Sequence, residues 1–272
     1  MARVSKRRIH KGGLDISYVL VDGRDADTIV AETPRRCQQG DVWELGTHRL
    51  ICGDATDPSV LARLMDGDEA RTVVFDPPYD APAGVLSLRP PCRDALVFSD
   101  HRHLLDCVEG WPPFRCQFVW DCCACWHTPG QPLARHKTAL WFGRSRYAPD
   151  GWKLPTEEEE PRSRVVRNTR GSYRYTNDPR GKRLATLFRS PITSEYAGHA
   201  HAKPIAWIAA LLGCCTNGPV LDPFAGSGTS IIACELLGRR CLAVEIAPNC
   251  CDVILDRWQS VFGGIAEKMR KK

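Results

Sequence analysis

The residues best suited to chemistry follow a short apolar run. Residues 72–75 are apolar or β-branched without a helical period, and Asp76-Pro77-Pro78-Tyr79 follows them, a pattern typical of a buried strand ending in a rigid loop. Each proline lacks an N–H, so the loop presents bare carbonyl oxygens beside the Asp76 carboxylate. Tyr79 adds a flat aromatic face. Acceptors that hold an amino group, next to a ring that stacks on a planar base, suit a flipped-out nucleobase.

A second group of such residues lies near the other end of the chain. Asp222-Pro223-Phe224-Ala225-Gly226-Ser227-Gly228-Thr229 follows one apolar run, and Glu245 ends the next. Gly226 and Gly228 permit a tight turn and close approach of a ligand, and an acid about 20 residues onward binds ribose hydroxyls in nucleotide-binding folds. The loop has neither the Gly-Lys-Ser/Thr of a P-loop nor the third glycine of a dinucleotide fingerprint. It therefore predicts a nucleoside-binding unit.

Strands and helices that alternate along the chain would position both loops. Hydrophobic periodicity and capping residues indicate the bounds of each element. Strands are expected at 16–21, 49–52, 72–75, 116–120, 138–142, 219–222 and 241–245, and helices at 58–65, 99–109, 205–213, 229–237 and 248–262. In an open α/β sheet ligands bind at the carboxyl ends of strands, which is where both loops are expected.

Together the two motifs resemble those of the S-adenosylmethionine-dependent DNA amino-methyltransferases, which methylate adenine N6 or cytosine N4. Asp-Pro-Pro-Tyr is similar to their catalytic motif and Asp-Pro-Phe-x-Gly-Ser-Gly-Thr to their cofactor motif. The catalytic motif comes first here, which resembles the permuted β group of the family. The resemblance covers about residues 41–262. It implies a circularly permuted Rossmann-like α/β fold, with a mostly parallel sheet, helices on both faces and an inserted target-recognition segment.

The permutation has a specific consequence for the sheet. The strand ending at Glu245 needs a neighbour that the chain after it no longer supplies. Residues 49–52 are expected to take that place.

The resemblance also assigns roles to matching residues, with S-adenosyl-L-methionine as the cofactor. The Asp222 loop would hold the methionine portion, Glu245 the ribose and Asp54 the adenine. Lys203 and Pro204 match a further cofactor motif, His-Pro-Thr-x-Lys-Pro in relatives, although Ala200 and His201 replace its Pro and Thr. His199 and His201 receive no catalytic role. The expected catalytic residues are Asp76, Pro77, Pro78 and Tyr79, and the expected cofactor contacts are Asp54, Lys203, Pro204, Asp222, Pro223, Phe224, Ala225, Gly226, Ser227, Gly228, Thr229 and Glu245.

Basic residues favour a polyanionic partner. The net charge is +5, and the positive residues gather near the N-terminus, at 162–189 and at 268–272. The middle cluster mixes arginines with Ser, Thr, Asn and Tyr, the side chains that grip phosphates and read base edges; a solvated surface loop is the alternative. The candidate contacts to double-stranded DNA are Arg162, Arg164, Arg167, Arg170, Arg174, Arg180, Lys182 and Arg183.

Fourteen cysteines are many for a chain without a secretory signal, so a metal site must be considered. Cys122 and Cys125 are the best candidates, but no second Cys-x-x-Cys pair lies at zinc-site spacing. We expect reduced, buried thiols and no metal. Cys214-Cys215 and Cys250-Cys251 fall in apolar helical surroundings, where cysteine packs as a small hydrophobe.

Composition shifts divide the chain into five parts. They are a basic extension (1–38), a catalytic half (39–143), a target-recognition insert (144–198), a cofactor half (199–263) and a basic tail (264–272). No bilayer-length apolar span or signal peptide is present, which predicts a cytoplasmic protein without a membrane partner. The resemblance implies a bacterial, archaeal or phage origin. A homodimer and a cognate restriction enzyme are both compatible with the sequence.

The leading hypothesis is N6 methylation of adenine in double-stranded DNA. Cytosine-N4 methylation is the nearest alternative, and enzymes of that type more often have Ser at the position of Asp76. A nucleic-acid-binding module that has lost activity is a further alternative, although the intact motifs argue against it. RNA is a third, but nothing in the chain resembles an RNA-binding module.

Overall fold

The computed structural model describes the backbone at 4–11, 14–21, 24–25, 34–78, 81–99, 105–126, 134–148, 163–168, 171–176, 186–189 and 203–269. Side chains are described at 34–78, 81–99, 105–122, 136–148, 186–188 and 203–269. All statements below concern these residues.

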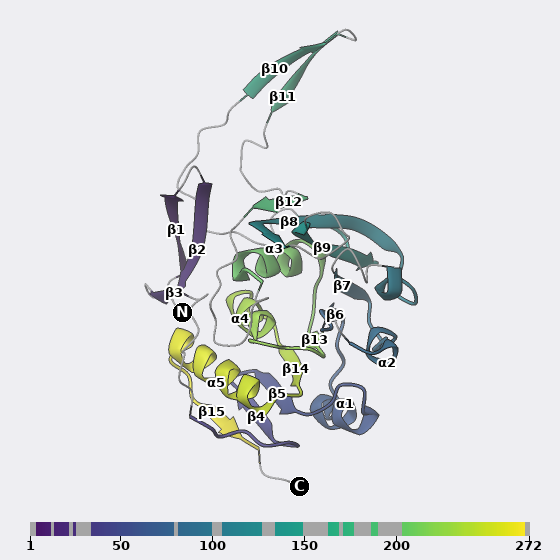
Figure 1. Cartoon of the computed structure of the whole chain (residues 1–272), viewed down its shortest axis with the longest axis vertical. Coiled ribbons are helices and arrows are strands. Elements are labelled where there is room, and N and C mark those ends of the chain that lie inside the picture. Colours follow the sequence, from purple (N-terminus) through teal and green to yellow (C-terminus); the bar gives the residue numbers. More distant parts are fainter. Residues whose placement is uncertain are drawn as a thin grey trace.

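The main sheet has ten strands. They are β4 (Val42–Leu45), β5 (His48–Cys52), β6 (Thr72–Phe75), β7 (Asp94–Ser99), β8 (Phe114–Trp126), β9 (Ala134–Gly143), β12 (Leu187–Arg189), β13 (Val220–Asp222), β14 (Cys241–Glu245) and β15 (Ala266–Lys268). Their spatial order is β12-β8-β9-β7-β6-β13-β14-β5-β4-β15 (Figure 1). The five central strands, from β7 to β5, run parallel, and antiparallel strands flank them.

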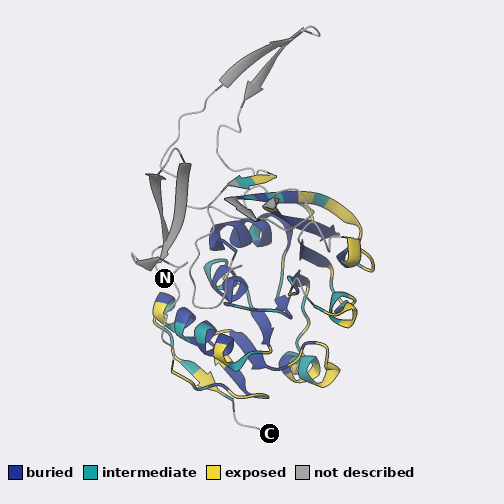
Figure 2. Ribbon diagram, viewed as in Figure 1, coloured by how far each residue is buried: buried dark blue, intermediate teal, exposed yellow. Residues whose placement is uncertain are grey.

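Helices cover both faces of this sheet. They are α1 (Pro58–Met65), α2 (Ala83–Leu86), α3 (Ile205–Cys215), α4 (Thr229–Leu236) and α5 (Pro248–Phe262), with a 3-10 turn at Leu105–Cys107. The strand residues alternate between the two faces, as a period of two requires: Val74 packs with α3, α4 and α5, whereas Val73 and Phe75 pack with α1 and α2. Figure 2 shows the buried residues concentrated in the central strands and in α3.

The neighbours of β14 explain how the two halves of the chain form one sheet. On one side β14 pairs with β13, and on the other it pairs in parallel with β5, where Leu242 faces Arg49 and Glu245 faces Cys52. Residues near the start of the chain therefore fill the place beside a strand near its end, as predicted. This order is compatible with a circular permutation.

Two small strand groups lie outside the main sheet. One contains β1 (Val4–Lys11), β2 (Leu14–Val21) and β3 (Arg24–Asp25), and the strand predicted at 16–21 falls within β2. The other is the hairpin of β10 (Ser163–Asn168) and β11 (Gly171–Thr176), in the segment predicted to recognise DNA. β12, from the same segment, pairs with β8 of the main sheet.

Most predicted elements agree with the structure, and one is wrong. Helix α1 has the predicted bounds, and the Asp57 side chain accepts from the Ser59 N–H at 2.8 Å as its cap. The helix predicted over 99–109 is incorrect at its start, because Ser99 ends strand β7 and does not cap a helix. Of the described residues in the rest of that range, Leu105–Cys107 form a single 3-10 turn, and residues 100–104 lie outside the described part of the chain. The apolar run of β7 is short and buried throughout, and its partners β6 and β9 are far away in sequence. Periodicity alone cannot assign such a run.

The cysteine thiols predicted to pack as hydrophobes, at 214, 215, 250 and 251, are buried in the core. Cys122 is also buried, and the side chain of Cys125 lies outside the described residues. The described residues contain no group of three or more His, Cys, Asp or Glu side chains arranged to hold a metal ion. Among the described helices, none has the length and apolar character that crossing a bilayer requires.

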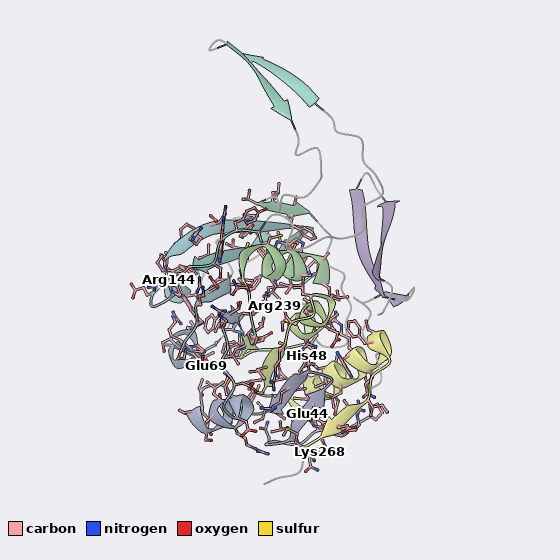
Figure 3. All side chains as sticks on the ribbon, turned by 180° about the vertical axis from the view of Figure 1, so that it is seen from behind. Glu44, His48, Glu69, Arg144, Arg239 and Lys268 are labelled. Carbon is pink, nitrogen blue, oxygen red and sulfur yellow. The ribbon has the colours of Figure 1, made fainter. Side chains whose placement is uncertain are left out.

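His48 joins four elements at the β5 side of the sheet (Figure 3). Its Nδ1 accepts the Cys241 N–H of β14 at 3.0 Å, and its Nε2 lies 2.7 Å from Glu235 of α4. Because a backbone N–H can only donate, Nε2 must carry the ring proton and donate it to Glu235. Glu235 also accepts from the Trp258 indole of α5 at 3.1 Å, and the His48 contact is the main cause that lowers its pKa below 4.5.

We predict that His48→Ala lowers the free energy of unfolding by about 2–4 kcal/mol, because it opens a cavity and leaves the Cys241 N–H without a partner. Urea denaturation at pH 7 measures this loss. Glu235→Gln is the control, since its amide oxygen still accepts both protons and the loss should be smaller.

The Glu235 charge adds a dependence on pH. Since folding lowers the pKa of Glu235, its contribution is present above the unfolded pKa, roughly 4.3, and disappears as the pH falls through the folded value. In Glu235→Gln, the free energy of unfolding should therefore depend less on pH below about 4.3 than in the wild type. If His48→Ala lowered the free energy of unfolding no more than a substitution at an exposed position, the structural role assigned to His48 would be wrong.

Candidate functional site

Four neighbouring strands end in acids at the same edge of the sheet. Asp76 follows β6, Asp222 ends β13, Glu245 ends β14 and Asp54 lies just past β5. Since these strands are parallel and adjacent, their carboxyl ends meet there. The pairing of Leu221 with Val73 brings the two predicted motifs side by side, although they lie far apart in the sequence.

The two loop glycines are required for different reasons. Both have positive φ, +54° at Gly226 and +79° at Gly228, a region that other residues rarely adopt. A Cβ on Gly228 would lie 3.0 Å from two side-chain carbons of Ile254, so this glycine permits close packing of the loop on α5. A Cβ on Gly226 would meet only the Phe224 carbonyl at 4.0 Å. Gly226 therefore borders open space, where a ligand can approach the backbone.

Glu245 closes the other side of this space. One carboxylate oxygen accepts the Gly226 N–H and the other accepts the Ala247 N–H, each at 2.8 Å. The side chain is buried but reaches the surface, with 8% of the residue exposed. A carboxylate oxygen can accept more than one hydrogen bond. Glu245 can therefore hold the loop and accept hydrogen bonds from a sugar at the same time.

Asp222 supports the loop from beneath. Its carboxylate accepts the Phe224 N–H at 3.0 Å and the Ser230 hydroxyl of α4. Burial raises the pKa of Asp222 to about 7, the hydrogen bonds from Ser230 and Phe224 oppose this, and the charges of Asp76 and Lys203 act in opposite directions. Asp222 is thus electrostatically linked to the other motif.

Arg257 is a part of the site that the sequence interpretation missed. It lies on α5, is 2% exposed, and its Nη1 donates to the Ser227 carbonyl at 2.9 Å and contacts the Thr229 hydroxyl at 3.3 Å. The guanidinium therefore fixes the loop from the side of α5. A charged residue on the buried stripe of an amphipathic helix, between Ile254 and Val261, was the signal that could have identified it.

Asp76 lies at the mouth of the site and forms an ion pair with Lys203. The Lys203 side chain is 6% exposed and that of Asp76 29%. The ammonium contacts Oδ2 of Asp76 and lies 5.0 Å from the centre of the Phe98 ring. Lys203, predicted as a cofactor contact, is thus joined directly to the predicted catalytic carboxylate, and Pro204 beside it occupies the cap position of α3.

The prolines after Asp76 have different environments. Pro77 is buried, whereas Pro78 is exposed and its carbonyl accepts the Ala81 N–H at 3.0 Å. Beneath them the Phe75 ring packs edge-on against Phe224 of the glycine loop, at 5.4 Å between centroids. The end of β6, just before the Asp76 loop, therefore packs directly against the glycine loop. Tyr79 lies outside the described residues.

The remaining predicted residues are placed as follows. Pro223, Ala225, Ser227 and Thr229 are buried in the glycine loop. Asp54 is exposed, and one of its oxygens accepts from the Thr56 N–H and hydroxyl at 2.8 and 2.7 Å. Of the predicted DNA contacts, Arg164 and Arg167 belong to β10 and Arg174 to β11, while Arg162, Arg170, Arg180, Lys182 and Arg183 lie outside the described residues.

A hollow of about 910 Å³ lies at the opposite edge of the sheet, next to the starts of β6 and β7. Glu69 and Arg144 line it and lie on one side of the molecule in Figure 3. It contains none of the predicted site residues. We therefore assign the functional site from the residues at the carboxyl-terminal edge of the sheet and not from the volume of this hollow.

The carboxyl-terminal edge combines two functions. The glycine loop and Glu245 provide open space and acceptors for a nucleoside-like group, and an S-adenosylmethionine molecule fits that donor and acceptor set. Asp76 provides a carboxylate immediately beside it. Such an arrangement can hold an amine next to a bound methyl donor.

Comparisons with known proteins agree with this reading. The N6/N4 methyltransferase family, described as DNA methylase, matches residues 103–256, more than half of the chain. The match contains the glycine loop, Lys203 and Glu245 and begins after Asp76. Comparison with curated proteins gives no match.

Several solved structures are similar. The M1.HpyAVI–SAM complex has 19% identity, covers 76% of this chain and 98% of its own, and has a TM-score of 0.50. TTHA0409 of Thermus thermophilus, crystallised with S-adenosyl-L-methionine, has 21% identity, coverage of 80% and 96%, and a TM-score of 0.45. The cytosine-N4-specific PvuII DNA methyltransferase has 13% identity, coverage of 80% and 94%, and a TM-score of 0.45.

The likeness to M1.HpyAVI, at a TM-score of 0.50, shows a methyltransferase fold. The family match covers the segment that carries the cofactor motif. The chain therefore belongs to the DNA methylase family, the S-adenosylmethionine-dependent DNA amino-methyltransferases.

Proposed function

We propose that this methylase transfers a methyl group from S-adenosylmethionine to N6 of an adenine flipped out of double-stranded DNA. The observation that carries the proposal is the carboxylate of Asp76 at the end of β6, directly beside the glycine loop that ends β13. An acid at this place, in contrast to a hydroxyl, favours adenine over cytosine in the family that the motif resembles.

The acceptors of the loop suit a primary amine on an aromatic ring. Such an amine is a weak nucleophile because its lone pair is delocalised, and an acceptor for each N–H favours a localised lone pair. Lys203 contacts only Oδ2 of Asp76, and no described residue donates to Oδ1 or to the Pro77 carbonyl. By contrast, the Ala81 N–H occupies the Pro78 carbonyl. Asp76 Oδ1 and the Pro77 carbonyl are therefore the pair that would hold the amine.

The chain's own residues contribute positioning and electrostatics. Bound S-adenosylmethionine supplies an activated methyl group on a sulfonium whose leaving group is neutral. Glu245 and the Gly226 backbone would orient the nucleoside part, while Asp222 and Arg257 keep the loop in place. The methylated amine becomes acidic, so its proton can leave late and no strong base is required. Base flipping costs a few kcal/mol, which stacking on Tyr79 would partly offset.

Cytosine-N4 methylation remains the alternative within the family. The direct test is to incubate the protein with unmethylated DNA and S-adenosylmethionine, digest the DNA and identify the methylated nucleoside by mass spectrometry. N6-methyldeoxyadenosine as the product supports the proposal. N4-methyldeoxycytidine alone would overturn the adenine assignment. The absence of both methylated nucleosides would overturn the proposed activity.

We predict that Asp76→Ala reduces methyl transfer by about 10²–10⁴-fold, the range for removing a positioned catalytic group. Cofactor affinity should stay nearly unchanged, because Asp76 lies outside the glycine loop. Single-turnover methylation and calorimetry with S-adenosylmethionine measure the two effects. An equal loss of cofactor affinity would show that Asp76 belongs to the cofactor site instead.

Glu245→Ala is expected to weaken cofactor binding by about 1–3 kcal/mol, the cost of losing hydrogen bonds to a charged group. DNA affinity should change little. Calorimetry checks the first effect, and urea denaturation separates it from the loss of the Gly226 and Ala247 contacts. Unchanged cofactor affinity in a folded variant would remove Glu245 from the ribose site.

The hairpin of β10 and β11 is proposed to contact DNA. Alanine at a phosphate-binding arginine should weaken binding to all sequences and reduce the salt slope by about one unit. Alanine at a base-reading residue should weaken discrimination between bases at one position of the recognition sequence, by about 1–3 kcal/mol. Arg164, Arg167 and Arg174 are the variants to measure, each by salt titration and by methylation of a random library. If none changes affinity, slope or site, another segment recognises DNA.

A further inference from the structure

One guanidinium lies where the two ends of the Asp76 loop, residues 76–82, come together. The loop begins after Phe75, the last residue of β6, and leads into helix α2, which Arg89 follows. The Cζ atom of Arg89 lies 5.5 Å from the centre of the Phe75 ring. Its Nη1 donates to the carbonyls of Leu86 and Leu88, at 2.5 and 2.9 Å. One side chain therefore contacts both the strand that enters the loop and the helix that leaves it.

The same side chain holds a third segment. The Nε of Arg89 donates to the Glu109 carbonyl at 2.5 Å, and its Cζ lies 4.8 Å from the centre of the Trp111 ring. Gly110, between these two residues, has a φ of +79°, and a Cβ there would lie 3.4 Å from both Cγ and Nε of Arg89. A glycine at this position therefore lets the turn pack closely against the arginine.

Helix α2 depends on tertiary contacts of this kind. It has four residues, none of them buried, and its N-cap residue, Pro82, makes no side-chain hydrogen bond. Leu86 and Leu88 are partly buried against the apolar cluster that contains Phe75. A single helical turn is marginal by itself, and a cation beside its last carbonyls is favourable. Arg89 thus adds directed polar contacts where apolar packing is limited.

The chemistry of the contacts suits arginine in particular. Burial lowers the pKa of Arg89, and the charge of Glu109 opposes this shift. Removal of the cation from water also strengthens its attraction to the two aromatic rings. A planar guanidinium can donate to carbonyls in separate directions while its faces lie against rings, which an ammonium group cannot do. Lysine should therefore replace Arg89 only in part.

We propose that Arg89 is a positioning residue for methyl transfer, which fixes both ends of the Asp76 loop so that its acceptors are aligned before the base arrives. This inference rests on the proposed role of Asp76 Oδ1 and the Pro77 carbonyl as acceptors for the target amine. Fixing the ends of a short loop removes many of its alternative conformations, and the prolines restrict it from within. A displacement of about 1 Å at reacting groups can cost about 100-fold in rate.

Arg239 allows a comparison with an arginine that has only a structural role. Its Nε and Nη1 donate to the Gly218 and Leu212 carbonyls, each at 2.8 Å, and burial lowers its pKa as well. It lies just before β14, at the amino-terminal edge of the sheet, away from the acids of the site. Loss of Arg239 should lower the free energy of unfolding without changing the rate of the folded enzyme.

The experiment compares the full chain with Arg89→Met, Arg89→Lys and Arg239→Met. Single-turnover methylation is measured with saturating DNA and S-adenosylmethionine, at a temperature where urea denaturation shows each variant to be folded. Arg89→Met should be slower by about 10–100-fold and Arg239→Met should match the wild type. Arg89→Lys should lie between them, and it serves the same comparison if Arg89→Met does not fold.

Cofactor binding provides a further check on the same variants. In the described part of the chain, Arg89 makes no hydrogen bond or ring contact with the glycine loop. The Kd for S-adenosylmethionine should therefore stay within about threefold of the wild-type value in Arg89→Met. A Kd that rises as much as the rate falls would overturn the proposal and place Arg89 in the cofactor site.

A double variant shows whether Arg89 acts through Asp76. If it does, Arg89→Met should slow methylation much less in an Asp76→Ala background than in the wild type, because the acceptor that it positions is gone. Two losses that multiply would overturn the proposal, and so would a wild-type rate in folded Arg89→Met.

Amide hydrogen exchange tests the contacts of Arg89 without relying on activity. In Arg89→Met the amides of residues 81–88 should exchange at least about tenfold faster, while those of β13 and β14 keep their wild-type rates. Unchanged exchange at 81–88 would refute the inference. Failure of the proposed function has a different signature: N4-methyldeoxycytidine as the product removes the adenine assignment but leaves the exchange and double-variant results to decide the role of Arg89.

Discussion

The parallel pairing of β6 with β13 is the contact on which the whole site depends. It joins residues about 150 positions apart and sets the ends of the two strands next to each other, because Val220 faces Thr72 and Leu221 faces Val73. From that register, Asp76 must emerge beside Asp222. The glycine loop, the Phe75–Phe224 contact and the Lys203 ion pair all follow from it. A shift by one residue would turn these side chains to the other face of the sheet.

Buried charge is stabilised at each point by directed donors. Both oxygens of Glu245 accept backbone N–H groups, Asp222 accepts one backbone N–H and one hydroxyl, and Arg257 donates to a carbonyl of the loop. Such partners offset part of the cost of removing a charge from water. The same contacts hold the loop in one conformation. Catalysis by positioning requires this rigidity, because the reacting groups must already be aligned when the substrates arrive.

The helices on the two faces of the sheet make different contributions to the site. Helices α3, α4 and α5 pack on one face of the sheet (Figure 1). Ser230 of α4, Arg257 of α5 and Lys203, just before α3, lie at the edge where the acids meet. Helices α1 and α2 cover the other face, in the same apolar cluster as Phe75. The Phe75 ring also packs edge-on against Trp111, with 5.2 Å between the ring centroids. The loop proposed to be catalytic thus rests on apolar packing beneath it, and charged groups contact it from the side.

The sequence alone determined the fold class and the two motifs, because strand periodicity, prolines and paired glycines are local signals. Asp76, Asp222, Gly226 and Glu245 could be chosen from those signals, and β5 could be placed beside β14. Only the tertiary structure decided that Lys203 pairs with Asp76, that Arg257 holds the glycine loop, and that Asp94–Ser99 is a strand and not the approach to a helix. Each depends on partners far away in sequence, and no local pattern records which buried groups meet across a sheet.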